Sequence, residues 1–216
     1  MEHDYSFVDW EEQWATFAPH FEGGLSHVDL GKLGEDAAGA ILQLKPGAGF
    51  GDLSHPTTRL TMALMLPLVK GNVVFDIGCG SGILSVGAAL LGAKKVYGLD
   101  IESAALEHSR ENAKLNRIDH KILFTKELRK NWISKAPLVI AMNMIWSEQE
   151  SAWGSLGLLH GKEASIVTSG LLSSQREEYL LLTQSWGWSL VEEKEEEGWM
   201  GFVFSQKGLI DPSLAS

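Results

Sequence analysis

The chain has 216 residues, 44% of them hydrophobic and 21% charged, and its formal net charge at pH 7 is −10. This composition is that of one globular domain and excludes a disordered or fibrous chain. No apolar run approaches the roughly 20 residues that span a bilayer, and the acidic, polar residues 1–4 do not resemble a signal peptide. We therefore expect a cytoplasmic protein without a membrane segment.

The sequence carries a single cysteine, Cys79, so no internal disulfide can form. His20, His27 and His55 are too scattered to indicate a zinc site, and we expect no metal. The negative net charge opposes binding to a phosphate backbone, where affinity comes mainly from Lys and Arg. Nucleic-acid binding is therefore not expected, and a basic protein is the better-matched partner. The alternative is that the charge only keeps the protein soluble.

Residues 1–46 predict a helical extension or linker packed on the main domain. Four aromatic side chains recur there at spacings of three and four, as on one face of a helix: Phe7, Trp10, Trp14 and Phe17. The helix would run over residues 5–21 and end before Gly23. Core packing is the expected role of this face, and binding of a partner is the alternative. Residues 41–44 predict a short strand.

A glycine-rich loop over residues 47–58 precedes a predicted helix that continues to Val69. Proline is favoured in the first helical turn, so the helix is expected to begin near Pro56. Ser54 or His55 can serve as its N-cap. This pattern alone predicts only that the loop leads into a capped helix, without contact to a ligand.

Residues 73–75 are an apolar run that predicts a buried central strand. Gly78, Gly80 and Gly82 follow at alternate positions, and residues 83–91 then predict a helix. A strand, a glycine turn and a helix allow backbone N–H groups and the helix N-terminus to approach a nucleotide closely. Glycine suits this turn because a Cβ atom would block both the turn and the ligand.

Two aspartates decide which nucleotide cofactor fits this turn. Asp76 lies just before the first glycine, and Asp100 ends the apolar run at residues 96–99. Asp100 follows Gly82 by 18 residues, close to the spacing of about 20 for a carboxylate that holds ribose hydroxyls. Counted from Gly78, the glycines fall at the first, third and fifth positions of the turn. The fingerprint of dinucleotide-binding proteins has glycines at the first, third and sixth positions. An acid beside the turn would repel a pyrophosphate but suits a cationic amino group, which favours S-adenosylmethionine over NAD or FAD.

The remaining segments complete an α/β pattern. Strands are predicted at residues 96–99, 121–125, 138–142 and 165–169, helices at 103–116, around Trp146 and Trp153, and at 173–185, and a hairpin at 188–193 and 199–205. We expect a doubly wound, Rossmann-like α/β fold with a seven-stranded sheet, mostly parallel with one antiparallel strand. This domain would cover residues 47–207, followed by a C-terminal tail at 208–216.

Several motifs resemble those of one family. DIGCGSG at residues 76–82, with Asp100 after the next strand, is similar to motif I and the ribose acid of class I methyltransferases. Three further stretches resemble motifs of the bacterial ribosomal protein methyltransferases (PrmA-like), which modify the stalk-base protein: FGDLSHPTT at 50–58, AMNMI at 141–145, and TSGLL at 168–172 with Gln175. The resemblance extends over residues 9–207, nearly the whole chain.

This resemblance implies S-adenosylmethionine as the cofactor, transfer of its methyl group to nitrogen, and a role for each matching residue. The residues expected to bind the cofactor are Phe50, Thr57, Asp76, Gly78, Gly80, Gly82, Asp100, Ile101, Glu127 and Asn143. Asn143 is also the expected catalytic residue, because its amide oxygen could hold the acceptor amine near the sulfonium methyl. Without the resemblance, an Asn after a strand indicates a turn and Glu127 an exposed side chain.

The sequence departs from the family in two ways. Family members carry an N-terminal substrate-recruiting domain, which we expect to be missing here, and Trp146 stands where aliphatic residues are usual. We therefore expect an N-methyltransferase acting on a protein amine, lysine or N-terminus, with the ribosomal stalk-base protein as a candidate. A small-molecule methyltransferase and a cofactor-binding protein without turnover are the alternatives.

Overall fold

The computed structural model describes residues 20–34, 37, 39–133 and 137–208. The helix predicted over residues 5–21 falls almost wholly outside this part of the chain, and Phe21 begins strand β1 instead. The tail predicted over residues 208–216 also lies outside it, except for Gly208. Within the described residues, no helix is both long enough and apolar enough to cross a membrane.

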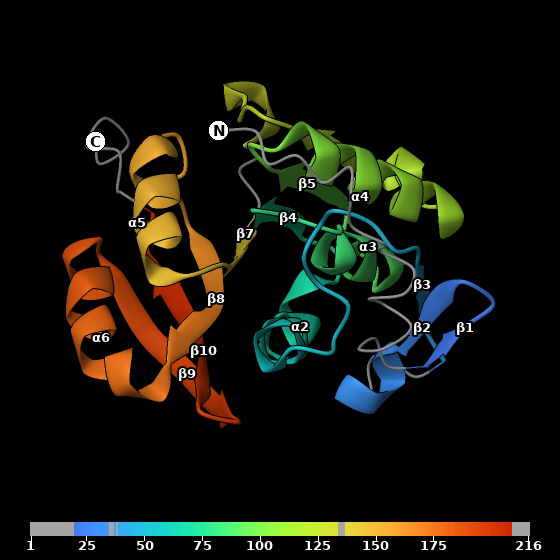
Figure 1. The fold of residues 1–216 in the computed structure, drawn as a ribbon. Helices are drawn as coiled ribbons and strands as arrows, with labels where there is room; N and C mark the ends of the chain where they lie inside the picture. Colours follow the sequence, from blue (N-terminus) through green and yellow to red (C-terminus); the bar gives the residue numbers. More distant parts are fainter. Residues whose placement is uncertain (1–19, 35–36, 38, 134–136, 209–216) are drawn as a thin grey trace.

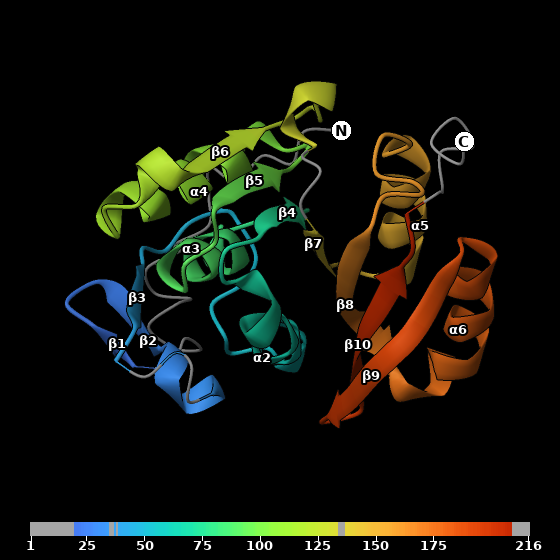
Figure 2. The same ribbon diagram turned by 180° about the vertical axis from the view of Figure 1, so that it is seen from behind.

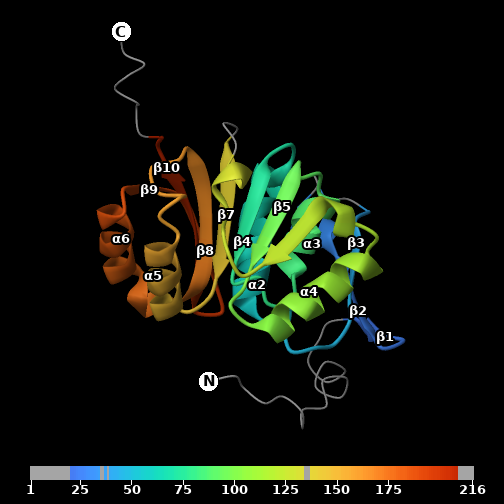
Figure 3. The ribbon, with the colours of Figure 1, turned by 90° about the horizontal axis from the view of Figure 1, so that it is seen from above.

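A seven-stranded sheet forms the centre of the molecule, in the order β6-β5-β4-β7-β8-β10-β9 (Figure 3). Its strands are β4 (Val73–Ile77), β5 (Lys95–Leu99), β6 (Ile122–Thr125), β7 (Leu138–Asn143), β8 (Ala164–Leu172), β9 (Trp188–Glu196) and β10 (Trp199–Gln206). The strands from β6 to β8 are parallel, and β10 is antiparallel to both of its neighbours. The predicted doubly wound sheet, mostly parallel with one antiparallel strand, is confirmed.

Helices cover both faces of this sheet: α2 (Pro56–Val69), α3 (Ile83–Leu90), α4 (Ser103–Leu115), α5 (Trp146–Ser155) and α6 (Arg176–Ser185). Side chains of α2, α3 and α4 pack with Val74 in one core, whereas Phe75 lies in a second core with Trp153 of α5 and Tyr179 of α6. Successive side chains of a strand point to opposite faces, so neighbours in β4 enter different cores. Figures 1 and 2 show α2, α3 and α4 grouped together, away from α5 and α6.

A small antiparallel sheet precedes the main one and consists of β1 (Phe21–Glu22), β2 (Leu25–Asp29) and β3 (Ile41–Leu44). The strand β3 has its predicted bounds, but the sequence did not indicate β1 and β2. The strand β1 has only two residues, and the sequence LSHVD of β2 does not alternate between apolar and polar residues. Leu42 and Leu44 of β3 are fully buried in the core that α3 and α4 share. The described part of the first 46 residues therefore packs on the main sheet's helices, and a domain boundary at residue 47 stays a prediction.

A buried polar cluster joins α5, α6 and the end of β8. The Gln149 amide donates to the carbonyl oxygens of Met144 (2.7 Å) and Ser169 (2.9 Å). The Tyr179 hydroxyl donates to Gln149 Oε1 (2.5 Å) and lies 3.0 Å from the Thr168 hydroxyl. Both Gln149 and Tyr179 are fully buried. The cluster therefore fixes the segment that leaves β7.

Replacing Gln149 by Leu should lower the free energy of unfolding by roughly 2–4 kcal/mol, because it removes the partners of two buried carbonyls and a hydroxyl. Urea unfolding measures this change. Gln184→Leu is the matched control, since Gln184 is exposed on α6, and it should change stability by less than about 0.5 kcal/mol. Equal stability of the two variants would contradict the role assigned to Gln149.

Candidate functional site

The candidate site lies at the edge of the sheet where the carboxyl ends of β4, β5, β6 and β7 meet. The chain order reverses between β4 and β7, which are neighbours in the sheet. Ligands of open α/β sheets bind in the crevice outside such a switch point. The glycine turn after β4, Asp100 after β5 and Asn143 at the end of β7 all stand at this edge.

The glycine turn has the conformation that its sequence predicts. Gly78, Gly80 and Gly82 all have a positive φ, of 70°, 54° and 81°. A Cβ atom on Gly80 would lie 2.5 Å from the carbonyl oxygen of Phe50, so only glycine fits there. The helix α3 begins directly after the turn, with Gly82 as its N-cap. Its amino end, which carries a partial positive charge, is therefore part of the site.

Asp100 holds the backbone of the site with both carboxylate oxygens. Oδ2 accepts a hydrogen bond from the Gly80 amide (2.9 Å), and Oδ1 accepts one from the Glu102 amide (2.9 Å). A carboxylate oxygen can accept more than one hydrogen bond, so the group can still bind a ligand hydroxyl. The Ile101 side chain beside it is 80% exposed. An acid and an apolar surface therefore lie together at the end of β5.

Asp76 lies fully buried beneath the glycine turn. Its Oδ2 accepts a hydrogen bond from the Ser85 hydroxyl of α3 (2.7 Å), and its Oδ1 has no partner among the described residues. Burial raises the pKa of the Asp76 carboxyl to about 7; the hydrogen bonds from Ser85 oppose this shift and the charge of Asp100 adds to it. A cation bound close to the turn would favour the ionised form of this carboxyl.

The loop before α2 folds directly over the glycine turn. The Ser81 amide donates to the Phe50 carbonyl (2.9 Å), and the Ser81 hydroxyl donates to the Gly51 carbonyl (2.5 Å). A Cβ atom on Gly49 would lie 2.3 Å from the carbonyl carbon of Gly80, so the two backbones are in contact. The Phe50 side chain remains 58% exposed at this place. The loop thus presents one aromatic ring beside the turn.

The β9–β10 hairpin holds the same loop from the other side. Arg59 of α2 forms ion pairs with Glu196 (2.6 Å) and Glu197 (2.8 Å) and donates to the carbonyls of Leu53 and Ser54. The other ion pairs of the hairpin are Arg176–Glu193 and Lys194–Glu192. These acidic side chains of the hairpin are therefore engaged by cationic side chains of the protein itself.

The start of α2 is capped by His55, one of the two predicted residues. Its Nδ1 accepts a hydrogen bond from the Thr57 amide (3.3 Å) and lies 2.9 Å from Thr57 Oγ1. Thr57 is buried, and its hydroxyl is thus engaged by His55. The His55 ring also packs edge-on against Phe50 (centroids 5.7 Å apart) and Trp199 (4.9 Å). These ring contacts connect the loop to β10.

Asn143 stands opposite the glycine turn with its amide group oriented by α2. Its Nδ2 donates to the Thr58 hydroxyl (3.2 Å), and its Oδ1 has no hydrogen bond within the described part of the chain. The next residue closes the gap to the turn, because a Cβ atom on Gly78 would lie 2.3 Å from Met144 Cε. The structure therefore brings Asn143 and the glycine turn together, with the Asn143 amide oxygen available as an acceptor.

A hollow of about 410 Å³ lies beyond Asn143, between α5, β8 and β10. It is lined by Ile145, Trp146, Ser147, Glu150, Gly170, Leu172, Gln175 and Trp199. Trp146 also packs edge-on against Tyr179, with ring centroids 5.9 Å apart, which supports its indole from behind. Two indoles and one carboxylate around an apolar hollow suit a cationic alkyl amine.

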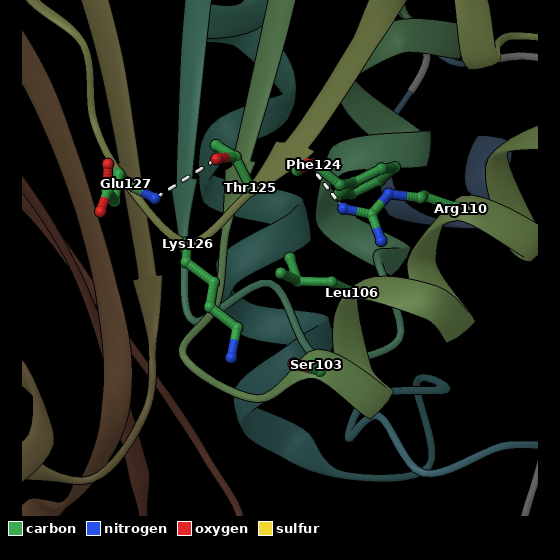
Figure 4. A pocket seen from close by; sticks show the side chains of 7 residues that line it. All are labelled: Ser103, Leu106, Arg110, Phe124, Thr125, Lys126 and Glu127. Carbon is green, nitrogen blue, oxygen red and sulfur yellow. Dashed lines mark hydrogen bonds between the residues drawn. The ribbon is translucent and has the colours of Figure 1, made fainter.

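A second hollow, of about 350 Å³, lies at the carboxyl end of β6 (Figure 4). Its lining residues are Ser103, Leu106, Arg110, Phe124, Thr125, Lys126 and Glu127. Figure 4 shows the Lys126 side chain turned toward Ser103, with Glu127 on the other side of the strand end. Glu127 is exposed, and its amide donates to the Thr125 hydroxyl (3.3 Å). Among the predicted site residues, Glu127 thus borders this hollow rather than the glycine turn.

The sequence did not reveal the inward face of α4. His108, Asn112 and Asn116 all hydrogen-bond backbone amides between residues 43 and 49. Their spacing of four residues was the available signal, because it places them on one side of a helix. Only the packing shows that this face is turned into the protein. No group of three or more potential metal ligands occurs among the residues described.

Comparison of the sequence with known proteins finds ribosomal protein L11 methyltransferases. The family model of ribosomal protein L11 methyltransferase (PrmA) matches residues 5–207. A ribosomal protein L11 methyltransferase of Caldanaerobacter subterraneus subsp. tengcongensis is 32% identical over 206 residues, which are 93% of this chain and 65% of that protein. One from Thiobacillus denitrificans is 35% identical over 169 residues, 78% of this chain and 55% of that protein. The chain thus spans less than two thirds of the length of these relatives.

Solved structures share the fold. The crystal structure of ribosomal protein L11 methylase from Lactobacillus delbrueckii subsp. bulgaricus has a TM-score of 0.64 and 28% identity, and covers 76% of this chain and 84% of its own. A Streptococcus pneumoniae protein solved in complex with S-adenosyl-L-methionine shares the fold at a TM-score of 0.53 and 16% identity, over 68% of this chain and 72% of its own. By its match over residues 5–207 and its methyltransferase fold, the chain belongs to the ribosomal protein L11 methyltransferase (PrmA) family.

Proposed function

We propose that this chain transfers the methyl group of S-adenosylmethionine to an amine of a protein. The observation that carries this proposal is that two carboxyl groups and an amide group lie on opposite sides of the switch point between β4 and β7. Asp76 and Asp100 flank the glycine turn on one side, and Asn143 stands on the other, where its amide oxygen has no hydrogen bond among the described residues. An aromatic hollow begins two residues further along the chain, at Ile145. In a member of a methyltransferase family, this arrangement supplies adjoining places for a cofactor and an acceptor.

The residues around the glycine turn fit the chemical groups of S-adenosylmethionine. The unpaired Oδ1 of Asp76 favours a cationic ammonium group, and Asp100 can accept hydrogen bonds from ribose hydroxyls. The amino end of α3 favours a carboxylate. Phe50 and Ile101 offer exposed apolar surface for the adenosine moiety. Direct contacts from Thr57 and Glu127 stay predictions, since the structure engages the Thr57 hydroxyl with His55 and leaves Glu127 exposed.

Bound S-adenosylmethionine would supply an electrophilic methyl group on its sulfonium. The contribution of this chain would be to position the acceptor and exclude water. Asn143 Oδ1 would accept an N–H of the amine and direct the nitrogen lone pair, and Thr58 would fix the plane of the amide. A lysine acceptor must first lose a proton, since its reference pKa is about 10.4. Like-charge repulsion by a nearby sulfonium favours that loss.

The hollow beyond Asn143 is the proposed entrance for the acceptor side chain. A lysine combines an apolar stem with a terminal charge, so the indoles of Trp146 and Trp199 can pack on the stem while Glu150 attracts the charge. The net charge of −10 favours the approach of a basic protein. Because the relatives are named ribosomal protein L11 methyltransferases, that ribosomal protein is the first candidate substrate.

A small-molecule amine is the second candidate acceptor. A volume of about 410 Å³ lies within the range of ordinary small-ligand pockets. The bulky Trp146 forms one wall of the hollow and is held by its contact with Tyr179. These two observations fit a free ligand as well as an inserted side chain, so the choice between the two requires a direct assay.

The proposal is tested by incubating the purified chain with S-adenosylmethionine labelled on its methyl group. Ribosomal protein L11 and a fractionated, hypomethylated lysate are offered in parallel, and mass spectrometry locates the label. We expect label on a lysine or on the N-terminal amine of L11. Label on another protein would show that this protein, and not L11, is the substrate. Label in the small-molecule fraction would favour a small-molecule amine as the acceptor. No label, with cofactor binding confirmed separately, would contradict methyl transfer by this chain alone.

Replacing Asp100 by Ala should weaken S-adenosylmethionine binding by roughly 30- to 100-fold, because the ribose loses a charged acceptor. Isothermal titration calorimetry measures the dissociation constant. Asp119→Ala is the matched control, since Asp119 is an exposed aspartate in the 3-10 turn η3 (Asp119–Lys121), and it should bind as the unmodified chain does. Unchanged affinity in Asp100→Ala would remove Asp100 from the cofactor site.

Replacing Asn143 by Ala should lower kcat by about 100-fold and change cofactor affinity by less than about threefold, because the side chain positions the acceptor. Single-turnover methylation and calorimetry give the two values. Asn131→Ala, in the exposed turn η4 (Lys130–Trp132), should alter neither of them. Equal losses of turnover and affinity in Asn143→Ala, or no loss in either, would not fit the proposed role.

A further inference from the structure

Polar side chains on the inward face of α4 hold the segment that leads into the loop over the glycine turn. Asn116 accepts from the Gln43 amide (2.9 Å) and donates to the Gln43 carbonyl (2.6 Å). One helical turn earlier, Asn112 accepts from the Lys45 amide (2.8 Å) and donates to the Ser81 carbonyl (2.9 Å). The same face of α4 therefore binds both the incoming segment and the glycine turn.

His108 is the next residue of this face and binds the loop itself. Its Nδ1 accepts from the Gly49 amide (3.0 Å), and its Nε2 donates to the Lys45 carbonyl (2.6 Å). One accepting and one donating ring nitrogen require a neutral imidazole with its proton on Nε2. Gly47 lies against the ring, since a Cβ atom there would be 2.5 Å from Cδ2 of His108. The imidazole is thus enclosed by the backbone that it binds.

We propose that His108 is a positioning residue whose neutral imidazole, protonated on Nε2, latches residues 47–51 onto the glycine turn. The link is short, because Gly49 directly contacts Gly80 and the next carbonyl, of Phe50, accepts from the Ser81 amide. The latch fixes where the exposed Phe50 ring stands. That this ring then covers a cofactor rests on the proposed function, whereas the latch itself does not.

The latch has a defined dependence on pH. Protonation would turn Nδ1 into a donor facing the Gly49 amide, which is also a donor, and would break the contact. Burial lowers the pKa of His108, and the Lys45 carbonyl and the Glu111 carboxylate oppose that shift. Lys45 and Glu111 are the described charged groups that act on the ring, and they pair with each other at 3.0 Å. The latch is therefore complete above pH about 6.5 and is lost as pH falls further.

Two substitutions separate the hydrogen bonds of the ring from its packing. An Asn side chain at position 108 can keep an acceptor near the place of Nδ1, whereas a Gln side chain can keep a donor near the place of Nε2. We expect His108→Gln to increase chymotrypsin cleavage after Phe50 by about tenfold, because the buried Gly49 amide loses its acceptor. His108→Asn should stay within about threefold of the unmodified chain. His120→Asn, at an exposed histidine of η3, is the matched control and should change nothing.

Nitrogen-15 spectra of the histidine rings provide a direct readout that loop packing alone would not move. The signals absent from His108→Asn identify His108, and they should show a protonated Nε2 and an unprotonated Nδ1 at pH 7.5. Protonation of Nδ1 at that pH, or equal cleavage of His108→Asn and His108→Gln at similar melting temperatures, would overturn the latch.

Cofactor affinity then distinguishes the latch from the function proposed above. We expect His108→Gln to bind S-adenosylmethionine about tenfold more weakly at pH 7.5. The unmodified chain should lose more affinity than His108→Asn between pH 7.5 and 5.5, since only it has an imidazole at this position to protonate. If cleavage after Phe50 rises as expected in His108→Gln but cofactor affinity does not change, the latch stands. The placement of the loop over the cofactor is then wrong.

Discussion

The direct contact of two backbone segments, residues 47–51 and the glycine turn, is the constraint on which the site depends. Gly49 and Gly80 approach so closely that a Cβ atom on either would overlap the other segment. Such contact requires residues without side chains, and it requires that the facing polar groups pair. The Ser81 amide and hydroxyl meet this need by donating to the carbonyls of Phe50 and Gly51. The part of the candidate site around the glycine turn is therefore built mainly from backbone.

Side chains from distant parts of the sequence hold the two segments in place. The inward face of α4 binds the loop through His108 and the glycine turn through Asn112, so one rigid helix sets their relative position. At the other end of the loop, Arg59 ties the carbonyls of Leu53 and Ser54 to the tip of the β9–β10 hairpin. The loop is thus anchored to α4 at one edge of the sheet and to the β9–β10 hairpin at the other edge. Its geometry depends on the whole domain having folded.

The buried carboxyl of Asp76 connects stability with the proposed function. A folded pKa of about 7 means that the protonated form is favoured in the folded state. Because the unfolded chain loses this proton first, Asp76 makes folding less favourable as pH rises from about 4 toward 7. A cationic ligand group near Oδ1 would stabilise the ionised form and offset this penalty. The ionised Asp76 carboxyl lowers the stability of the fold when no ligand is bound, and an ammonium group beside it would remove that cost. Asp76 is therefore suited to bind a cofactor that carries an ammonium group.

The sequence by itself determined the fold class and the glycine turn with its two neighbouring acids. Those features are local: three glycines at alternate positions, an acid before them, and a second acid after the next strand all lie within residues 76–100. The hollow beyond Asn143 was decided only by the tertiary structure. Trp146 and Trp199 share one hollow although a helix and two strands separate them, and Arg59 meets Glu196 across 137 positions. Likewise, only packing turned His108 inward. The periodicity of a sequence describes residues that are neighbours along the chain. These contacts form between elements that meet only when the whole domain folds.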